Sequence, residues 1–341
     1  NSSTRNNLKQ FSKVGHEDAK TWMERRLAGM KNGVPVAEAA VLSREWVSSA
    51  DADTLRGMDP GIADIEAANL AKQYARWHVQ RIGNMEQTRP DGVFRIMGGQ
   101  INSASSSEVR ARKTSDIIRL INDWEIQGGC LSQVGIDWST YSPSANLASW
   151  FRLELPDIRS HTAHNKHEQG IAHHQPGGTA TIACKELVRY VKNKGDDFRG
   201  LGRWCSTLMY ADINHRFRIV SAYNVGRQAP RGDSTIFQQQ LRYIQNHHLS
   251  TTPRRLFMID FLAMLQAWRQ QGDRLLIFMD MNEHILNGPL ARRMARMGLE
   301  EATHKNWGSL EPHTYVGGKE PIDAVFHSPD LDVTATMQLS F

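Results

Sequence analysis

The chain contains 341 residues, of which 40% are hydrophobic, and it carries a formal net charge of +5 at pH 7. This length and composition allow a large buried core, and the absence of any apolar run of about 18 residues or more excludes a membrane-spanning helix. The excess of basic residues permits a polyanionic partner such as DNA, but an ordinary basic surface explains the charge equally well.

Three cysteines, Cys130, Cys184 and Cys205, have neither the spacing of a zinc site nor the density of a disulfide framework. We therefore expect reduced cysteines within strands and no disulfide partner. The first residues contain no apolar core of a signal peptide, which predicts an intracellular protein, with the nucleus among its compartments. The oligomeric state is left open.

Apolar residues at helical spacing recur over residues 1–90 and predict a helical N-terminal extension. Its tryptophan and methionine stripes are interpreted as packing surface rather than as a cofactor site. The turn signal Arg89-Pro90-Asp91-Gly92 marks the predicted boundary with a second domain over residues 91–341.

After this boundary, short apolar runs alternate with helical segments. Predicted strands cover residues 94–101, 128–136, 179–187, 203–211, 216–224, 274–280 and 322–328, and predicted helices cover residues 107–127, 234–247, 255–270 and 288–297. The connection 212–215 is short enough for an antiparallel hairpin. Strands mixed with helices, including a hairpin, predict an α/β fold with mixed rather than purely parallel sheets.

The polar stretch 156–178 is predicted to be a loop, and it contains five histidines: His161, His164, His167, His173 and His174. Two interpretations are open for these histidines, a metal site or a solvated histidine-rich loop. Their spacing matches no helical or zinc-finger pattern, so the solvated loop is favoured.

Polar residues stand at the ends of several predicted strands. The apolar run Leu275 to Met279 leads directly into Asp280, and Asn282 follows. Taken alone, this pair is explained equally well as a turn that ends a strand. Other predicted strands also begin or end in polar residues, namely Asn102, Tyr223, Asn224 and Asp323. Polar groups that converge from several strand ends form a site.

An ordered set of segments resembles the endonuclease/exonuclease/phosphatase superfamily, which has the DNase I-like fold. The set consists of GGTATIACKEL, GLGRW, VSAYN, DMNEH, MGLEEA and PIDAVFHSPDL. The resemblance covers residues 91–341 and is closest to the endonuclease domains of non-LTR retroelements. It implies an α+β four-layer sandwich of two packed mixed sheets flanked by helices. It also implies a Mg²⁺-dependent phosphodiesterase that nicks DNA.

The resemblance assigns two positions to the metal, Asn102 and Gln133. The second position should hold a glutamate, but Ser132-Gln133-Val134 contains no carboxylate. A neutral amide in place of an anionic ligand lowers the expected affinity for Mg²⁺. The chain also reaches Phe341 without the Asp-His pair that such enzymes carry. Both features predict that the chain as written does not nick DNA much above background.

The resemblance assigns catalytic roles to four further residues. Asp280 would orient the attacking water, and Asn282 and Tyr223 would donate hydrogen bonds to phosphate oxygens. Asp323 would position a histidine through its ring N–H.

Two arginines, Arg203 and Arg227, stand beside strand ends and are expected to contact phosphate groups of DNA. Surface solvation is an equally good account of both. Two other functions are open for the whole domain. One is a catalytically dead module of the same fold that binds nucleic acid or protein, and the other is a hydrolase of lipid or inositol phosphates.

Overall fold

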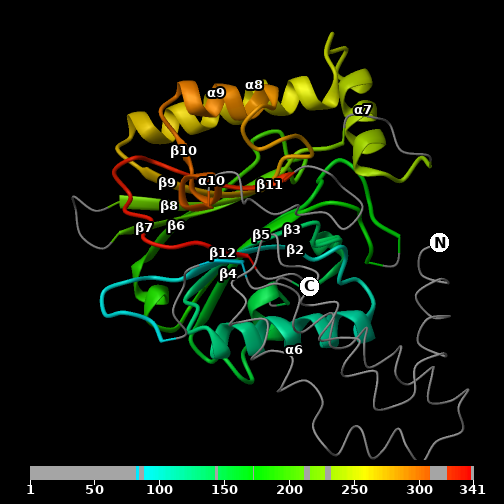
Figure 1. Cartoon of the computed structure of the whole chain (residues 1–341). Helices are drawn as coiled ribbons and strands as arrows, with labels where there is room; N and C mark the ends of the chain where they lie inside the picture. The colour runs from blue at the N-terminus through cyan, green and yellow to red at the C-terminus, as the bar shows by residue number, and fades with distance from the viewer. Residues whose placement is uncertain are drawn as a thin grey trace, which may run out of the picture. The chain divides into compact units, whose positions relative to one another are not determined.

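A computed structural model (Figure 1) describes residues 82–83, 88–142, 145–171, 173–210, 216–226, 232–307 and 321–338. The predicted helical extension over residues 1–90 lies outside this part of the chain, apart from a few residues at its end. The chain divides into two units, residues 1–83 with 337–341, and residues 84–336. In the first unit, β1 (Ile82–Gly83) pairs with β12 (Met337–Gln338) in antiparallel orientation.

The second unit contains two mixed β-sheets. The smaller sheet has the order β2-β3-β5-β4, with strands at Ile96–Gln100, Gly128–Ser132, Thr179–Cys184 and Ile158–Ala163. The larger has the order β10-β11-β9-β8-β7-β6, with strands at Glu300–Glu301, Asp323–His327, Arg274–Asp280, Arg216–Tyr223, Trp204–Tyr210 and Val191–Asp196. The pairs β2/β3 and β8/β9 are parallel, and β7/β8 is the predicted antiparallel hairpin.

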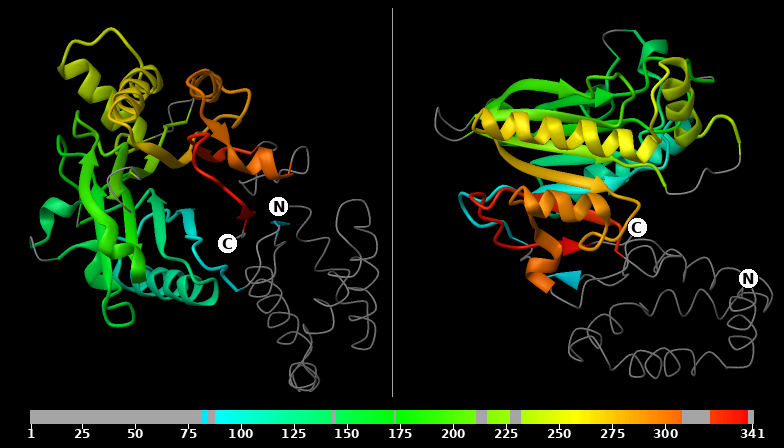
Figure 2. Two further views of the ribbon diagram at one scale, coloured as in Figure 1. Left: turned by 90° about the vertical axis from the view of Figure 1, so that its left-hand side faces the viewer. Right: turned by 90° about the horizontal axis from the view of Figure 1, so that it is seen from above.

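Helices cover the outer faces of both sheets (Figures 1 and 2). The α-helices are α6 (Ser107–Asp123), α7 (Ile236–Asn246), α8 (Pro253–Gln270), α9 (Pro289–Arg296) and α10 (Ala302–Trp307). Short 3₁₀ helices lie at Trp138–Thr140, Leu147–Trp150 and Lys185–Tyr190. With α6 on the smaller sheet and α8 and α9 on the larger, the unit has the predicted four layers. No helix among the described residues is long and apolar enough to cross a bilayer.

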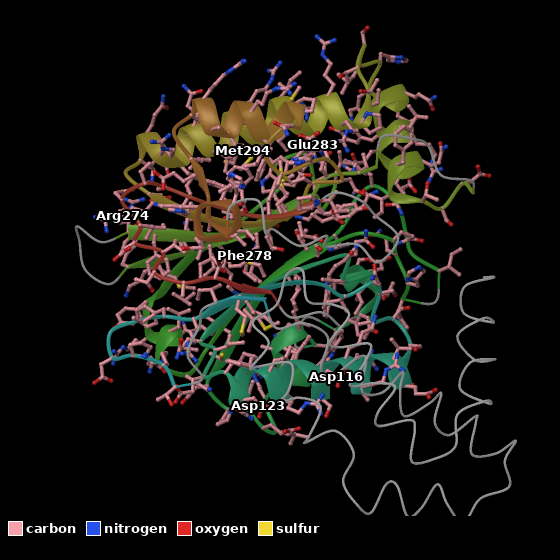
Figure 3. All side chains as sticks on the ribbon, in the orientation of Figure 1. Asp116, Asp123, Arg274, Phe278, Glu283 and Met294 are labelled. Carbon is pink, nitrogen blue, oxygen red and sulfur yellow. The ribbon has the colours of Figure 1, made fainter. Side chains whose placement is uncertain are left out.

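The apolar side chains of β9 explain why its sequence is an unbroken apolar run. Leu275, Ile277 and Met279 pack into the core beneath α8 and α9, and Phe278 packs into the core between the two sheets. Figure 3 shows Phe278 in this layer. A Cβ added at Gly98 of β2 would lie 2.3 Å from Phe278 Cδ1, so the close approach of the sheets requires a glycine there. All three cysteines are buried and free, as expected.

Several strands were not predicted from the sequence, and the two longest of them lie at sheet edges. The stretch 156–178, predicted to be a loop, contains β4 over Ile158–Ala163, and β6 occupies Val191–Asp196. Each pairs with only one neighbour, and three residues of β6 are exposed. Edge strands need fewer apolar residues than central strands, so these two lack the apolar runs that marked the others. The short elements β10 and α10 were missed as well.

Candidate functional site

The ends of three neighbouring strands bring Tyr223, Asp280 and Asp323 together. In the sheet register, Asp280 stands opposite Tyr223 on the parallel strand β8 and opposite Asp323 on the antiparallel strand β11. Residues directly opposite one another project from the same face of a sheet. Three of the predicted site residues therefore form one row across the larger sheet.

Asp280 lies in the middle of this row and is 5% exposed. Burial, together with the negative charge of Asp323, raises the pKa of Asp280 from its ordinary value of 3.8 to about 8. The backbone N–H of Asn282 donates to Asp280 Oδ1 over 3.0 Å and offsets part of this shift. The carboxyl of Asp280 therefore holds a proton to a higher pH than an isolated aspartate does.

Tyr223 links the two sheets at the site. Its hydroxyl lies near the side chains of Asn282 and Gln133, and Gln133 follows β3 of the smaller sheet. Burial and the neighbouring Asp280 raise the pKa of Tyr223 to about 12, so its phenol keeps its proton at neutral pH. Asn282 is anchored in turn, because its Nδ2 donates to the carbonyl of Asn224 over 2.7 Å.

Asn102 and Gln133 lie side by side after the parallel strands β2 and β3. The N–H of Ser103 donates to the carbonyl of Gln133 over 2.8 Å. The ammonium of Lys113 on α6 holds the turn, since it donates to the carbonyls of Asn102 (3.2 Å) and Ser103 (2.8 Å). The side chain of Asn102 is exposed.

Three of the predicted site residues have left-handed backbone conformations. Asn102, Gln133 and Asn282 have φ angles of 52°, 52° and 48°. Such a conformation costs a non-glycine residue about 1 kcal/mol or more, and it commonly occurs where a functional side chain must be aimed. At Gln133 the effect is visible: Leu131, two positions earlier, packs in the α6-side core, whereas Gln133 turns to Tyr223.

Arg254 and Glu283 support the site and were not assigned a role from the sequence. The guanidinium of Arg254 on α8 pairs with the carboxylate of Glu283 and donates to the carbonyls of Val225 and Asn282, beyond the ends of β8 and β9. Glu283, labelled in Figure 3, also accepts from Leu290 N over 2.7 Å at the start of α9. Sequence offered no signal for this pair, because its members are 29 positions apart.

The expectation that Arg203 contacts phosphate is wrong. Its side chain has no exposed surface, and its guanidinium is bonded to Asp197 over 2.6 and 2.8 Å and to Asp260 over 2.9 Å. A buried arginine with two carboxylate partners is a structural ion pair and cannot reach a ligand. Arg227 lies outside the described residues.

The donor set does not fit a tightly held Mg²⁺ ion. Among the described residues, no three histidine, cysteine, aspartate or glutamate side chains come together as ligands. Gln133, at the position where a carboxylate was expected, is neutral and lies near Tyr223. Mg²⁺ prefers anionic oxygen ligands, and the pair Asp280 and Asp323 offers carboxylates without a third.

The five histidines each contact a different protein group. His161 is bonded to Asp196, His164 lies 3.8 Å from Asp137, and His167 contacts the carbonyl of Arg199. His173 Nδ1 lies 2.6 Å from Thr140 Oγ1, and His174 Nδ1 lies 3.1 Å from Ser103 Oγ. The structure therefore shows neither a metal site nor a solvated loop among these histidines. Each histidine instead contacts a neighbouring protein group and holds the stretch in place.

No protein-family model matches the chain, and no curated protein sequence matches it. Several solved structures match the chain in fold. The human Nocturnin catalytic domain has a TM-score of 0.50 at 15% identity, over 76% of this chain and 91% of that one. The 3′ phosphatase NExo from Neisseria, bound to a product DNA hairpin, has a TM-score of 0.46 at 13% identity, over 70% and 87%. An AP endonuclease from Archaeoglobus fulgidus has a TM-score of 0.45 at 13% identity, over the same shares.

At these identities the likeness concerns the fold. The match with Nocturnin and the two packed mixed sheets confirm the predicted DNase I-like sandwich.

Proposed function

We propose that this domain binds the phosphodiester backbone of DNA at the row of strand ends, as a nicking-type endonuclease would, and that its own Mg²⁺-dependent hydrolysis is weak. One observation carries the proposal. The register of the larger sheet brings Tyr223, Asp280 and Asp323 into one row, and the side chains of Asn282 and, from the smaller sheet, Gln133 lie near the Tyr223 hydroxyl.

The chemistry of this group suits a bound phosphate. The Tyr223 hydroxyl stays protonated and the Asn282 amide carries no charge, so both can donate to phosphate oxygens. Protonation of Asp280 leaves the Asp280 and Asp323 pair with about one negative charge rather than two. The electrostatic barrier to an approaching phosphodiester anion is lower than it would be beside two carboxylates.

The same features limit hydrolysis. The raised pKa of Asp280 lowers the fraction of its carboxyl that is ionised, so less of it can take a proton from an attacking water than an ordinary aspartate could at the same pH. Gln133 supplies no charge to a metal at the position where the resemblance expects a glutamate. These two properties favour the second candidate function, a module that binds nucleic acid without cutting it. The order of the segments quoted above supports descent from a retroelement endonuclease.

A plasmid-nicking assay tests the weak hydrolysis. We expect the unmodified chain and Asp280→Ala to nick supercoiled DNA at similar, near-background rates in Mg²⁺. Robust EDTA-sensitive nicking by the unmodified chain that Asp280→Ala abolishes would show that Asp280 takes part in hydrolysis and that the hydrolysis is not weak, which contradicts this part of the proposal.

Calorimetric titration with Mg²⁺ tests the role of Gln133 separately. Because Glu adds an anionic oxygen at the same place, we expect Gln133→Glu to bind Mg²⁺ roughly 10-fold more tightly than the unmodified chain, as the charge of a ligand set controls affinity. Gln133→Leu serves as a control without a donor and should not bind more tightly. Equal affinities for the Glu variant and the unmodified chain would remove Gln133 from the metal position.

A further inference from the structure

A histidine contacts the turns that carry Asn102 and Gln133. Val134 and Ile136 both pack in the α6-side core, and Gly135 lies between them in the turn after β3 with a left-handed φ of 73°. A Cβ added at Gly135 would lie 2.6 Å from Ser103 Oγ, and Ser103 follows Asn102. The ring of His174 lies against these two residues.

The contacts of His174 fix which ring nitrogen faces solvent. Nδ1 lies 3.1 Å from the carbonyl oxygen of Gly135 and 3.1 Å from Ser103 Oγ. A carbonyl oxygen only accepts, so Nδ1 carries the proton and Nε2 is the nitrogen that gains a second one. In the part of the chain that the structure describes, no hydrogen bond reaches Nε2, and Nε2 is not among the buried atoms that lack a partner. It is therefore accessible to a ligand.

The backbone around His174 is held on two sides. The next residue, Gln175, is buried, accepts from Asn165 N over 2.8 Å and donates to Asn165 O over 2.8 Å. Asn165 in turn donates to Gln239 on α7 over 3.0 Å. On the other side, Gly135 N donates to the carbonyl of Gly177 over 2.8 Å. A side chain on a segment fixed in this way needs little reorganisation to bind a ligand.

We propose that His174 is a second phosphate-binding residue, whose Nε2–H donates to a backbone phosphate of the same DNA strand next to the one bound by Tyr223 and Asn282. The inference rests on the proposed function and adds a contact from the smaller sheet. It explains why a histidine-rich stretch is fastened at this sheet end, where a protonated imidazole offers a charge that Gln133 does not.

The titratable groups around His174 have partners of their own. Asp137 accepts from Ser139 and from Gly170, and its nearest imidazole is that of His164. Lys113 is bound to the carbonyls of the turn at Asn102. His173, the adjacent residue, contacts Thr140 and the ring of Tyr141. The ring of His174 thus has no carboxylate partner among the described residues, and its second nitrogen can meet an external anion.

Fluorescence anisotropy with a labelled DNA duplex, in EDTA at pH 6, tests the inference on the full chain. We expect His174→Ala to weaken binding roughly 10-fold, as for the loss of one hydrogen bond to a charged group. Ser103→Ala should weaken DNA binding less than His174→Ala does, because this substitution only removes one hydrogen-bond partner of the His174 ring. His173→Ala is the matched control and should bind like the unmodified chain.

A fourth variant separates this inference from the proposed function. Asn282→Gly removes a donor from the central site and keeps the left-handed backbone accessible. If Asn282→Gly weakens binding and His174→Ala does not, His174 is no ligand and the proposed function stands. If neither variant weakens binding, both proposals fail. Unchanged melting temperatures establish that each variant is folded.

Discussion

At the scale of single residues, the site is defined by two carboxyl groups that a sheet register forces together. Asp280 and Asp323 stand opposite each other, and burial prevents water from screening their charges. As a consequence, the pKa of Asp280 is raised and its carboxyl retains a proton more readily. Sequence alone indicated each aspartate at a strand end, but it could not indicate their pairing, which depends on the register of strands 43 positions apart.

Asp280 should make the stability of the domain depend on pH. Its folded pKa of about 8 exceeds the ordinary value of 3.8, so the folded state binds this proton more tightly than the unfolded state. The stabilisation is fully present below about 3.8 and is lost as the pH rises through about 8. Urea unfolding between pH 5 and 8 should show the free energy of unfolding of the unmodified chain falling more steeply than that of Asp280→Asn, by at most ~1.4 kcal/mol per pH unit. Parallel curves for the two proteins would contradict this.

Arg254 should matter more for stability than its neighbour Arg255. Arg254→Met leaves the carboxylate of Glu283, which is 5% exposed, without its guanidinium partner. Breaking one side of a buried ion pair costs about 3 kcal/mol or more. Arg255→Met, at an exposed position of the same helix, should change the free energy of unfolding by about 0.5 kcal/mol or less.

A double variant checks the mechanism of that loss. Glu283→Gln combined with Arg254→Met removes the buried charge together with its partner, so it should recover part of the stability. Additive losses in denaturant unfolding would indicate that the two side chains act independently.

At the scale of helices and strands, the pattern of apolar residues predicted the buried elements correctly. It did not predict the more exposed elements. The central strand β9 appeared as a five-residue apolar run, and α6, α7 and α8 appeared through their periodicity. The edge strands β4 and β6 were missed because half of each strand faces outward. The buried Arg203 was misjudged for a related reason, since a sequence does not reveal which charges are neutralised inside the fold.

The packing of β2 against β9 gives a test at this scale. Gly98→Ala would place a Cβ within 2.3 Å of the Phe278 ring, so it should destabilise the domain by about 1–3 kcal/mol. Gly99→Ala is a close control, because a Cβ at the next position meets nothing within 4 Å. Thermal unfolding of the two variants compares them directly. Equal melting temperatures would mean that the two sheets can move apart to accept the Cβ at position 98 without a loss of stability.

At the scale of the whole molecule, the order of short segments along the chain predicted the DNase I-like sandwich, although no single segment is specific. Order succeeds because several of these segments, such as VSAYN, DMNEH and PIDAVFHSPDL, carry the ends of neighbouring strands, which the sheet register brings together. The contact between Gln133 and Tyr223 could not be predicted in the same way, since it joins different sheets and depends on a left-handed turn. The roles of the site residues stay predictions that binding experiments must test.

The affinity of the chain for duplex DNA in the presence of EDTA tests the central claim most directly. If the site binds phosphate without Mg²⁺, the unmodified chain should bind with an affinity that falls as salt is raised. Asn282→Gly should weaken binding roughly 10-fold, as expected for a lost hydrogen bond to a charged group. Asn246→Ala, at an exposed position on α7, should bind like the unmodified chain. An affinity for DNA that does not change with salt concentration, or that is the same for Asn282→Gly and the unmodified chain, would contradict the account.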